Sequence, residues 1–118
     1  MRALSTIFFA ALLGLGLSSS LMAAENDQSL ESLTEVIQTN CAVCHNDILR
    51  GQFADLSLQH YDVARAAELG PTTEKMIVKL RAGMMPPPGM PRPSEAVMET
   101  LVSTLENQVD RAAAENPN

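Results

Sequence analysis

Apolar residues recur every three or four positions in several stretches of this chain, which is the spacing of helices that bury one face. The first stretch contains Leu30, Leu33, Val36, Ile37 and Cys41. We expect this helix to begin after Ser29 or Ser32, because a serine side chain can accept a hydrogen bond from the first turn, and to run into the cysteines. No stretch alternates apolar and polar residues for long enough to predict a sheet. The pattern therefore predicts an all-α fold.

The middle of the chain contains signals for two further helices. Asp62 can cap a short helix, which the pair Gly70 and Pro71 would end. The next helix is expected to begin at Thr72 or Thr73. Its apolar face contains Met76, Ile77 and Leu80. We therefore expect a helix on each side of the Gly-Pro pair.

A proline-rich loop separates that helix from the last one. Gly83 is expected to end the helix, and the following stretch, MMPPPGMPRP at 84–93, contains five prolines in ten residues and cannot be helical. Ser94 can cap the last helix, which is expected to continue to Ala114. Its apolar positions are Val97, Leu101, Leu105 and Val109. The pattern predicts one small helical domain.

The N-terminal segment has the pattern of an export signal. Residues 1–24 combine a positive start at Arg2 with an apolar run and a stretch of small residues. The expected mature domain is 25–118, with a periplasmic or otherwise exported, bacterial-type location. Leu21 and Met22 stand where a cleavage motif prefers small residues, so an uncleaved membrane anchor stays an open alternative.

Charge and aromatic content narrow the class of protein. Removal of residues 1–24 leaves seven basic against 14 acidic residues, a formal charge of −7. Such a surface repels nucleic acid and favours a partner protein with a basic docking face. Phe53 and Tyr61 are the only aromatic residues of the mature part, so a domain of this size has a thin core. A bulky apolar cofactor at the centre would fill it.

The stretch CAVCHN at 41–46 holds both cysteines and one of the two histidines. The spacing C-x-x-C-H is the signature of covalent attachment of a c-type haem. Positions i, i+3 and i+4 share one helix face, so Cys41, Cys44 and His45 can all face one flat ligand. The thiols would form thioethers to the haem, and His45 would be the proximal iron ligand. We therefore expect one covalent haem c.

Two other interpretations of the cysteines are weaker. A structural zinc ion normally has four protein ligands, and His60 is the only other histidine. A redox-active disulfide with this spacing is typical of a βαβ context, which the helical pattern does not predict. Haem attachment remains the prediction that the signature and the export signal favour together.

A six-coordinate haem needs a second axial ligand. The candidates are His60 and the three methionines of the proline-rich loop, Met84, Met85 and Met90. Prolines restrict the loop before folding, so positioning a thioether over the iron costs less conformational entropy. His60 precedes an expected helix start, a poor position from which to reach across the haem. The loop is therefore the expected source of the ligand.

Three motifs together resemble a known family, the planctomycete-type cytochrome c module at the N-terminus of large secreted multidomain proteins of unknown function. They are CAVCHN, KLRAGMMPPPGMPRP at 79–93 and VDRAAAENPN at 109–118. The resemblance covers 33–118 and implies a class I cytochrome c fold with histidine and methionine on the iron. In that class the ligand methionine commonly precedes a proline, which implies Met85, with Met84 as the alternative. The larger proteins continue beyond the match, so a module acting alone or with a partner subunit is expected.

These features predict a function without enzymatic catalysis. An iron ligated by histidine and methionine has no position for a substrate, so the expected role is single-electron transfer. A gas- or peroxide-binding haem protein, whose methionine dissociates, is the alternative, and a haem subunit of a larger secreted enzyme is a third. The acidic side chains are scattered along helices and form no catalytic group that we can assign.

Overall fold

The computed structural model describes residues 29–117, and the expected export signal at 1–24 lies outside them. The elements are, in order, α1 (Leu30–Asn40), the 3₁₀ turn η1 (Arg50–Gln52), the 3₁₀ turn η2 (Val63–Arg65), α2 (Gly70–Arg81) and α3 (Glu95–Glu115). No strand occurs in this described part, so the prediction of a small all-α domain is confirmed. Within 29–117, no helix has the length and apolarity that crossing a membrane requires.

Helix α1 begins and ends close to the expected positions. Ser29 is its N-cap, and the Ser29 hydroxyl accepts a hydrogen bond of 3.1 Å from the Ser32 N–H. The helix ends at Asn40, and Cys41 is the C-cap, whose N–H still donates to the Ile37 carbonyl. The cysteine stretch therefore begins at the C-cap of α1 and lies outside the helix.

The segment around Gly70 differs from the expectation. Asp62 caps only the single turn η2, by accepting a 2.8 Å hydrogen bond from the Ala64 N–H. Gly70 and Pro71 do not end a helix, because α2 begins at Gly70 and Pro71 stands in its first turn. A proline is favoured there because the first helical residues donate no intrahelical hydrogen bond. The expected start at Thr72 or Thr73 was therefore wrong by two residues or more.

The ends that face the proline-rich loop match the sequence signals. Gly83 adopts a left-handed conformation, with φ of 65°, and its N–H donates to the Leu80 carbonyl. The Met84 N–H donates to the Lys79 carbonyl at 3.0 Å, which completes a Schellman motif. Beyond the loop, Ser94 caps α3 by accepting from the Val97 N–H. Both helix ends are thus fixed by local hydrogen bonds.

All three helices contribute to one core. Helix α2 packs against α3, and α1 packs against η2. The core side chains include Leu33, Ile37, Leu58, Tyr61, Val63, Ala66, Met76, Leu101 and Leu105. The buried Thr73 hydroxyl lies 2.7 Å from the Tyr61 hydroxyl and donates to the Ala66 carbonyl, so α2 is hydrogen-bonded to the segment before it. The amphipathic patterns of the sequence therefore correspond to real buried faces.

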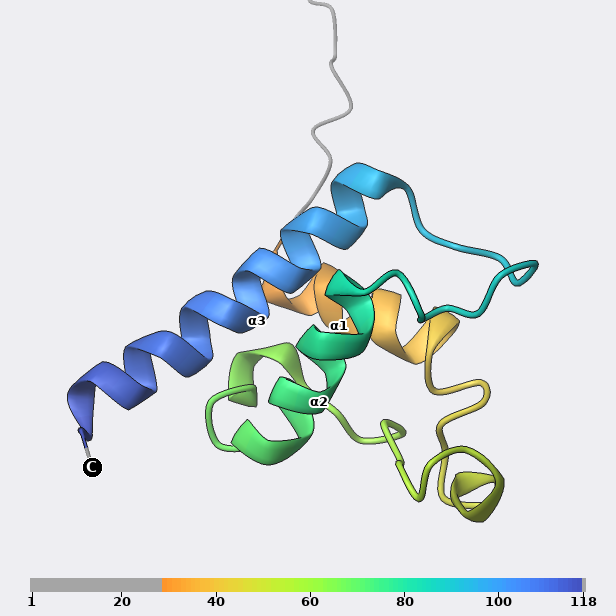
Figure 1. Cartoon of the computed structure of the whole chain (residues 1–118), viewed down its shortest axis with the longest axis horizontal. Helices are drawn as coiled ribbons and strands as arrows, with labels where there is room; N and C mark the ends of the chain where they lie inside the picture. Colours follow the sequence, from red (N-terminus) through yellow and green to blue (C-terminus); the bar gives the residue numbers. More distant parts are fainter. Residues whose placement is uncertain (1–28, 118) are drawn as a thin grey trace, which may run out of the picture.

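Two segments outside the helices lie on the same side of the domain. Figure 1 shows the segment that follows α1, in yellow, and the loop between α2 and α3, in teal, both away from the C-terminal end of α3. The first contains the cysteines, and the second contains the proline-rich loop. The fold thus brings the two sequence motifs to one side.

Candidate functional site

The cysteine stretch forms one hydrogen-bonded turn after α1. The Cys41 carbonyl accepts from the Cys44 N–H at 3.2 Å and from the His45 N–H at 2.9 Å. These are the i+3 and i+4 contacts of a helical turn. The backbone at Cys41, Cys44 and His45 therefore forms a helical turn, which begins directly after the last residue of α1.

Both cysteines are half-buried free thiols. Burial raises the pKa of the Cys41 thiol to about 11, so at neutral pH this side chain is protonated. Across 29–117, no three side chains of histidine, cysteine, aspartate or glutamate form a group that could hold a metal ion.

His45 lies in a partly enclosed position. Its Nδ1 atom is buried and has no hydrogen-bond partner among the described residues, which leaves an imidazole nitrogen available to a bound group. The ring contacts the Phe53 ring edge-on, with centroids 6.0 Å apart and planes at 70°. The His45 carbonyl accepts a 2.7 Å hydrogen bond from the Leu58 N–H. Phe53, which the sequence analysis treated only as a core candidate, is thus a contact of the expected ligand.

Asn46 connects the two halves of the cysteine segment. Its amide nitrogen donates to the carbonyls of Ala42 and Val43 at 3.1 and 3.2 Å. Its amide oxygen accepts from the N–H groups of Ile48 and Leu49 at 3.1 and 3.0 Å. Asparagine is suited to this position because its side chain offers both donors and acceptors. The sequence analysis did not identify this residue, although asparagine directly after C-x-x-C-H is a turn signal.

The proline-rich loop has its own hydrogen-bonded turn. The Met90 N–H donates to the Pro87 carbonyl at 3.1 Å, and Gly89 has φ of 88°. Proline at the second position and a glycine of positive φ at the third define a type II turn. The Met85–Pro86 peptide bond before it is cis. The loop is therefore a defined structure rather than an extended linker.

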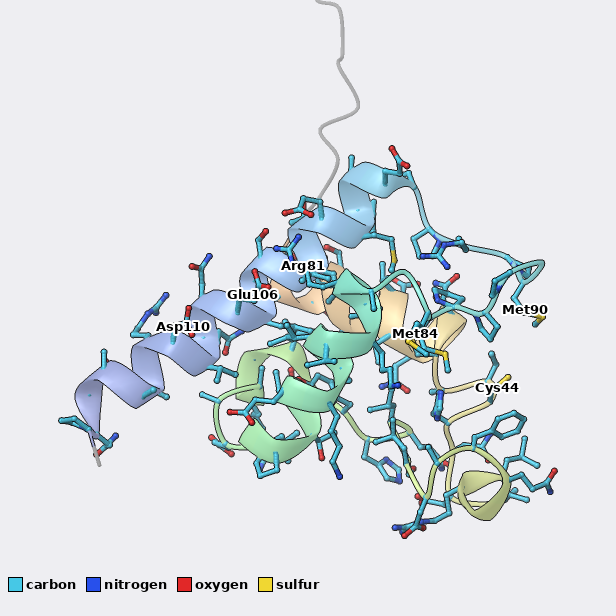
Figure 2. The ribbon with its side chains drawn as sticks, in the orientation of Figure 1. Cys44, Arg81, Met84, Met90, Glu106 and Asp110 are labelled. Atoms are coloured by element: carbon cyan, nitrogen blue, oxygen red, sulfur yellow. The ribbon has the colours of Figure 1, made fainter. Side chains whose placement is uncertain are left out.

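The three loop methionines differ in exposure. Met84 and Met90 are 51% and 49% exposed, whereas Met85 is less exposed than either of them. The Met84 sulfur lies 3.8 Å from the Lys79 ammonium, which donates to it. In Figure 2, Met84, Met90 and Cys44 all lie on the side of the domain where the two motifs meet. Met85 thus combines partial burial with a position next to the first proline.

The second histidine lies on the surface. The His60 side chain is 80% exposed, and its Nε2 atom is 3.7 Å from a carboxylate oxygen of Asp47. Such an exposed contact contributes little to stability. The interpretation of His60 as an ordinary surface residue agrees with this position.

Most of the large apolar side chains that are exposed within 29–117 belong to the segments of the two motifs. Of the seven large hydrophobic side chains that are exposed within 29–117, five come from residues 43–53 and 84–90. They are Val43, Ile48, Phe53, Met84 and Met90. The chemistry of the residues therefore fits a large apolar group bound between the segment of the cysteines and the loop of the methionines.

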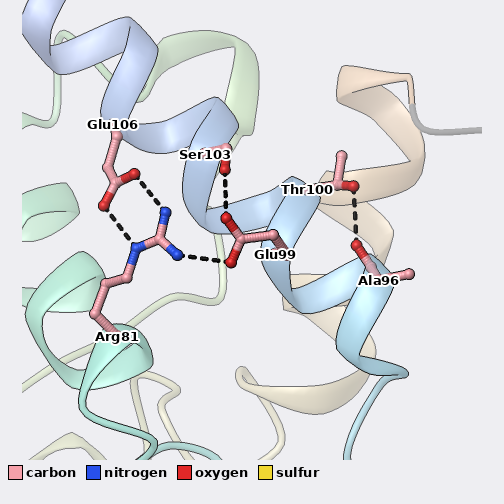
Figure 3. Close-up of polar contacts among 6 residues, drawn as sticks. All are labelled: Arg81, Ala96, Glu99, Thr100, Ser103 and Glu106. Atoms are coloured by element: carbon pink, nitrogen blue, oxygen red, sulfur yellow. Dashed lines mark hydrogen bonds and ion pairs between the residues drawn. The ribbon is translucent and has the colours of Figure 1, made fainter.

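An ion-pair network fixes the base of the loop. Arg81, at the end of α2, donates to both carboxylate oxygens of Glu106 at 2.8 and 2.6 Å and to Glu99 at 2.6 Å, as Figure 3 shows. Ser103 donates to the other oxygen of Glu99. These contacts lower the pKa of Glu99 and of Glu106, mainly through the hydrogen bonds from Arg81. The helix that leads into the loop is thus held to α3 by a planar guanidinium.

Comparisons with known proteins returned no matching family model, no matching curated protein and no matching solved structure.

Proposed function

We propose that this protein is an exported monohaem c-type cytochrome that transfers single electrons. The haem would be attached through Cys41 and Cys44, with His45 and Met85 as iron ligands. The resemblance of three motifs to the planctomycete-type cytochrome c module supports this proposal, and membership of that family stays a prediction. The fold that the resemblance implies, a class I cytochrome c fold, is likewise part of the proposal.

The observation that carries the proposal is that most of the large apolar side chains exposed within 29–117 belong to the two segments that contain the expected ligands. A haem is large and mostly apolar, and it would cover such side chains on both of its faces. The turn that orients Cys41, Cys44 and His45 supplies two thiols and an imidazole on one segment. The proline-rich loop supplies the thioether of Met85, and hydrogen bonds within the loop already order its backbone. Both parts of a His/Met site are therefore available on one side of the domain.

Each residue of the site would have a distinct task. Cys41 and Cys44 would hold the haem covalently, so the haem would not dissociate from the protein outside the cytoplasm. His45 ligates from the cysteine segment, and Phe53 restrains the rotation of its ring. Met85 ligates from the loop, and a thioether in this position favours a higher reduction potential than a second histidine. When bound, the haem iron supplies the one-electron chemistry.

Covalent attachment is tested by denaturing the exported protein in acid and organic solvent. Haem is expected to remain on the polypeptide, and replacement of Cys41 and Cys44 by alanine should leave none attached. His60→Ala is the matched control, because this exposed side chain should not affect attachment. Release of haem from the unmodified chain under these conditions would contradict the proposal.

The sixth ligand is tested with two neighbouring variants. Met85→Ala should abolish the sulfur-to-iron charge-transfer band and lower the reduction potential, because the thioether is lost. Met84→Ala should keep the band, since this exposed side chain lies beside Lys79. Loss of the band only in Met84→Ala would move the assignment by one residue. Loss of low-spin character in His60→Ala alone would contradict ligation by the loop.

The alternative function, gas or peroxide binding, makes the opposite prediction for an added ligand. Carbon monoxide mixed with the reduced protein at neutral pH should leave the spectrum unchanged, because Met85 occupies the sixth position. Rapid and stoichiometric formation of a carbonyl complex would support the gas-binding alternative instead.

The acidic surface favours a redox partner protein with a basic docking face. The mature chain has a formal charge of −7, so its electron exchange with a cationic redox reagent should slow as salt is added. Exchange with an anionic reagent should quicken, because salt screens the repulsion. Exchange that quickens with salt for the cationic reagent, or slows with salt for the anionic one, would contradict an acidic docking surface.

A further inference from the structure

The prolines leave the loop short of backbone donors. Of the ten residues at 84–93, five are prolines, which have a carbonyl but no N–H group. A loop of this composition cannot satisfy its carbonyls through backbone hydrogen bonds alone. Carbonyls of the loop, among them those of Met85 and Pro86, therefore depend on donors from side chains or solvent.

Arg92 supplies these donors from the far end of the same loop. One terminal nitrogen of its guanidinium donates to the Met85 carbonyl at 3.3 Å, and the other donates to the Pro86 carbonyl. The two bonds close the loop across the type II turn. They act on the backbone of the residue that is proposed to ligate the iron.

Arg92 makes this contact at the edge of a hollow that acidic residues also line. Arg92 lines an open hollow of about 460 Å³ whose walls also include Glu95 and Glu99. Among the described residues, however, Arg92 forms no ion pair, whereas Arg50, Arg65 and Arg81 do. The guanidinium thus donates to two loop carbonyls rather than to an acidic side chain.

We propose that Arg92 is a positioning residue for Met85, holding the Met85 and Pro86 carbonyls so that the thioether stays on the iron. This inference rests on the proposed function. A guanidinium presents its two terminal nitrogens in a fixed plane, so one side chain can bind two adjacent carbonyls. Lysine has the same charge but a compact ammonium on a flexible stem, and it cannot reproduce this geometry.

The test compares Arg92→Lys and Arg92→Gln with a matched control, Arg65→Gln. Arg65 is exposed and pairs with Glu68, so its replacement removes one positive charge without touching the loop. The measured quantities are the intensity of the sulfur-to-iron charge-transfer band, the pH at which the band is lost, and the reduction potential. Covalent haem content and helix content report whether each variant has folded, which we expect because Arg92 is exposed.

Both Arg92 variants should favour release of the methionine. The equilibrium between released and bound thioether should shift on the order of ten-fold, the effect expected for the loss of hydrogen bonds from a charged donor. The band should then disappear about one pH unit lower than in the unmodified protein, since a ten-fold change corresponds to one unit. The reduction potential should fall in both variants, whereas Arg65→Gln should keep the band and the pH of its loss.

The outcomes separate this inference from the proposed function. An unmodified protein without covalent haem, or without the band, would contradict the proposed function and the role of Arg92 with it. A band of normal intensity and normal pH dependence in both Arg92 variants would overturn only the role of Arg92. Full recovery in Arg92→Lys with loss in Arg92→Gln would also overturn it, because charge alone would then explain the effect.

Discussion

Replacement of Asn46 by alanine should loosen the cysteine segment. The change removes two donated hydrogen bonds, to Ala42 and Val43, and two accepted ones, from Ile48 and Leu49. Loss of an asparagine that accepts from turn N–H groups costs about 1 kcal/mol. The two partly exposed donor bonds add roughly 1 kcal/mol together. The free energy of unfolding should therefore fall by about 2 kcal/mol, and the melting temperature by about 10 °C.

Two further variants separate these contributions. Asn46→Asp keeps an oxygen that accepts from the following N–H groups but lacks the amide donors, so about half of the loss is expected. Asn40→Ala is the matched control, because the Asn40 amide donates to the Val36 carbonyl and the Thr39 hydroxyl within α1. Its replacement should leave the cysteine segment unaffected.

Amide hydrogen exchange measures the effect at the right place. The amides of Ile48 and Leu49 should exchange faster in Asn46→Ala, and close to the normal rate in Asn46→Asp and Asn40→Ala. Chemical denaturation supplies the free energy of unfolding of each variant. Unchanged exchange at these two amides in Asn46→Ala would refute the reasoning, because the hydrogen bonds would then contribute nothing to the order of the segment.

Two more predictions concern the framework around the site. Thr73→Val should lower the free energy of unfolding, measured by chemical denaturation, by about 1 to 3 kcal/mol. The change leaves the buried Tyr61 hydroxyl and the Ala66 carbonyl without the Thr73 hydroxyl as a partner. A smaller loss of stability than in Tyr61→Phe would contradict this reasoning. Glu106→Gln should lower the melting temperature at neutral pH, since the hydrogen bonds from Arg81 depress the pKa of Glu106. That stabilisation is present above the ordinary pKa of glutamate and is lost as the pH falls through the lowered value, so the variant and the unmodified protein should converge in acid. Glu35→Gln, an exposed control without a described ion pair, should show no such convergence.

Local signals in the sequence predicted most of the fold. Ser29, Asp62 and Ser94 act as caps because their side chains accept from N–H groups two or three residues later, a relation confined to one turn. Gly83 ends α2 because it adopts a positive φ. Gly70 was misjudged, since glycine followed by proline can either end a helix or begin one. Packing against neighbouring residues decides whether such a pair ends or begins a helix, and the periodicity of apolar residues gives no information about that packing.

The positioning contacts of the site were much less predictable. Cys41, Cys44 and His45 were predicted as site residues because haem attachment has a fixed spacing in the sequence, and this stays a prediction. The contact of Phe53 with His45 depends on how the chain returns after the cysteine turn. The hydrogen bonds of Arg92 depend on the path of the loop. Both contacts join residues that lie outside the α-helices, so the helical pattern of apolar positions gave no information about them.

The two sides of the domain are stabilised by different forces. The core between α1, α2 and α3 is held by buried apolar side chains, whereas the cysteine segment and the loop depend on hydrogen bonds from side chains such as Asn46 and Arg92. Each of these bonds contributes only about 0.5 to 1.5 kcal/mol, so the two segments should open at a lower free energy than the core. A covalently bound haem would cover the apolar side chains exposed there and add binding energy to the folded state. In the proposed arrangement the side-chain hydrogen bonds would specify where the expected ligands stand, and the haem would supply the stability that keeps them there.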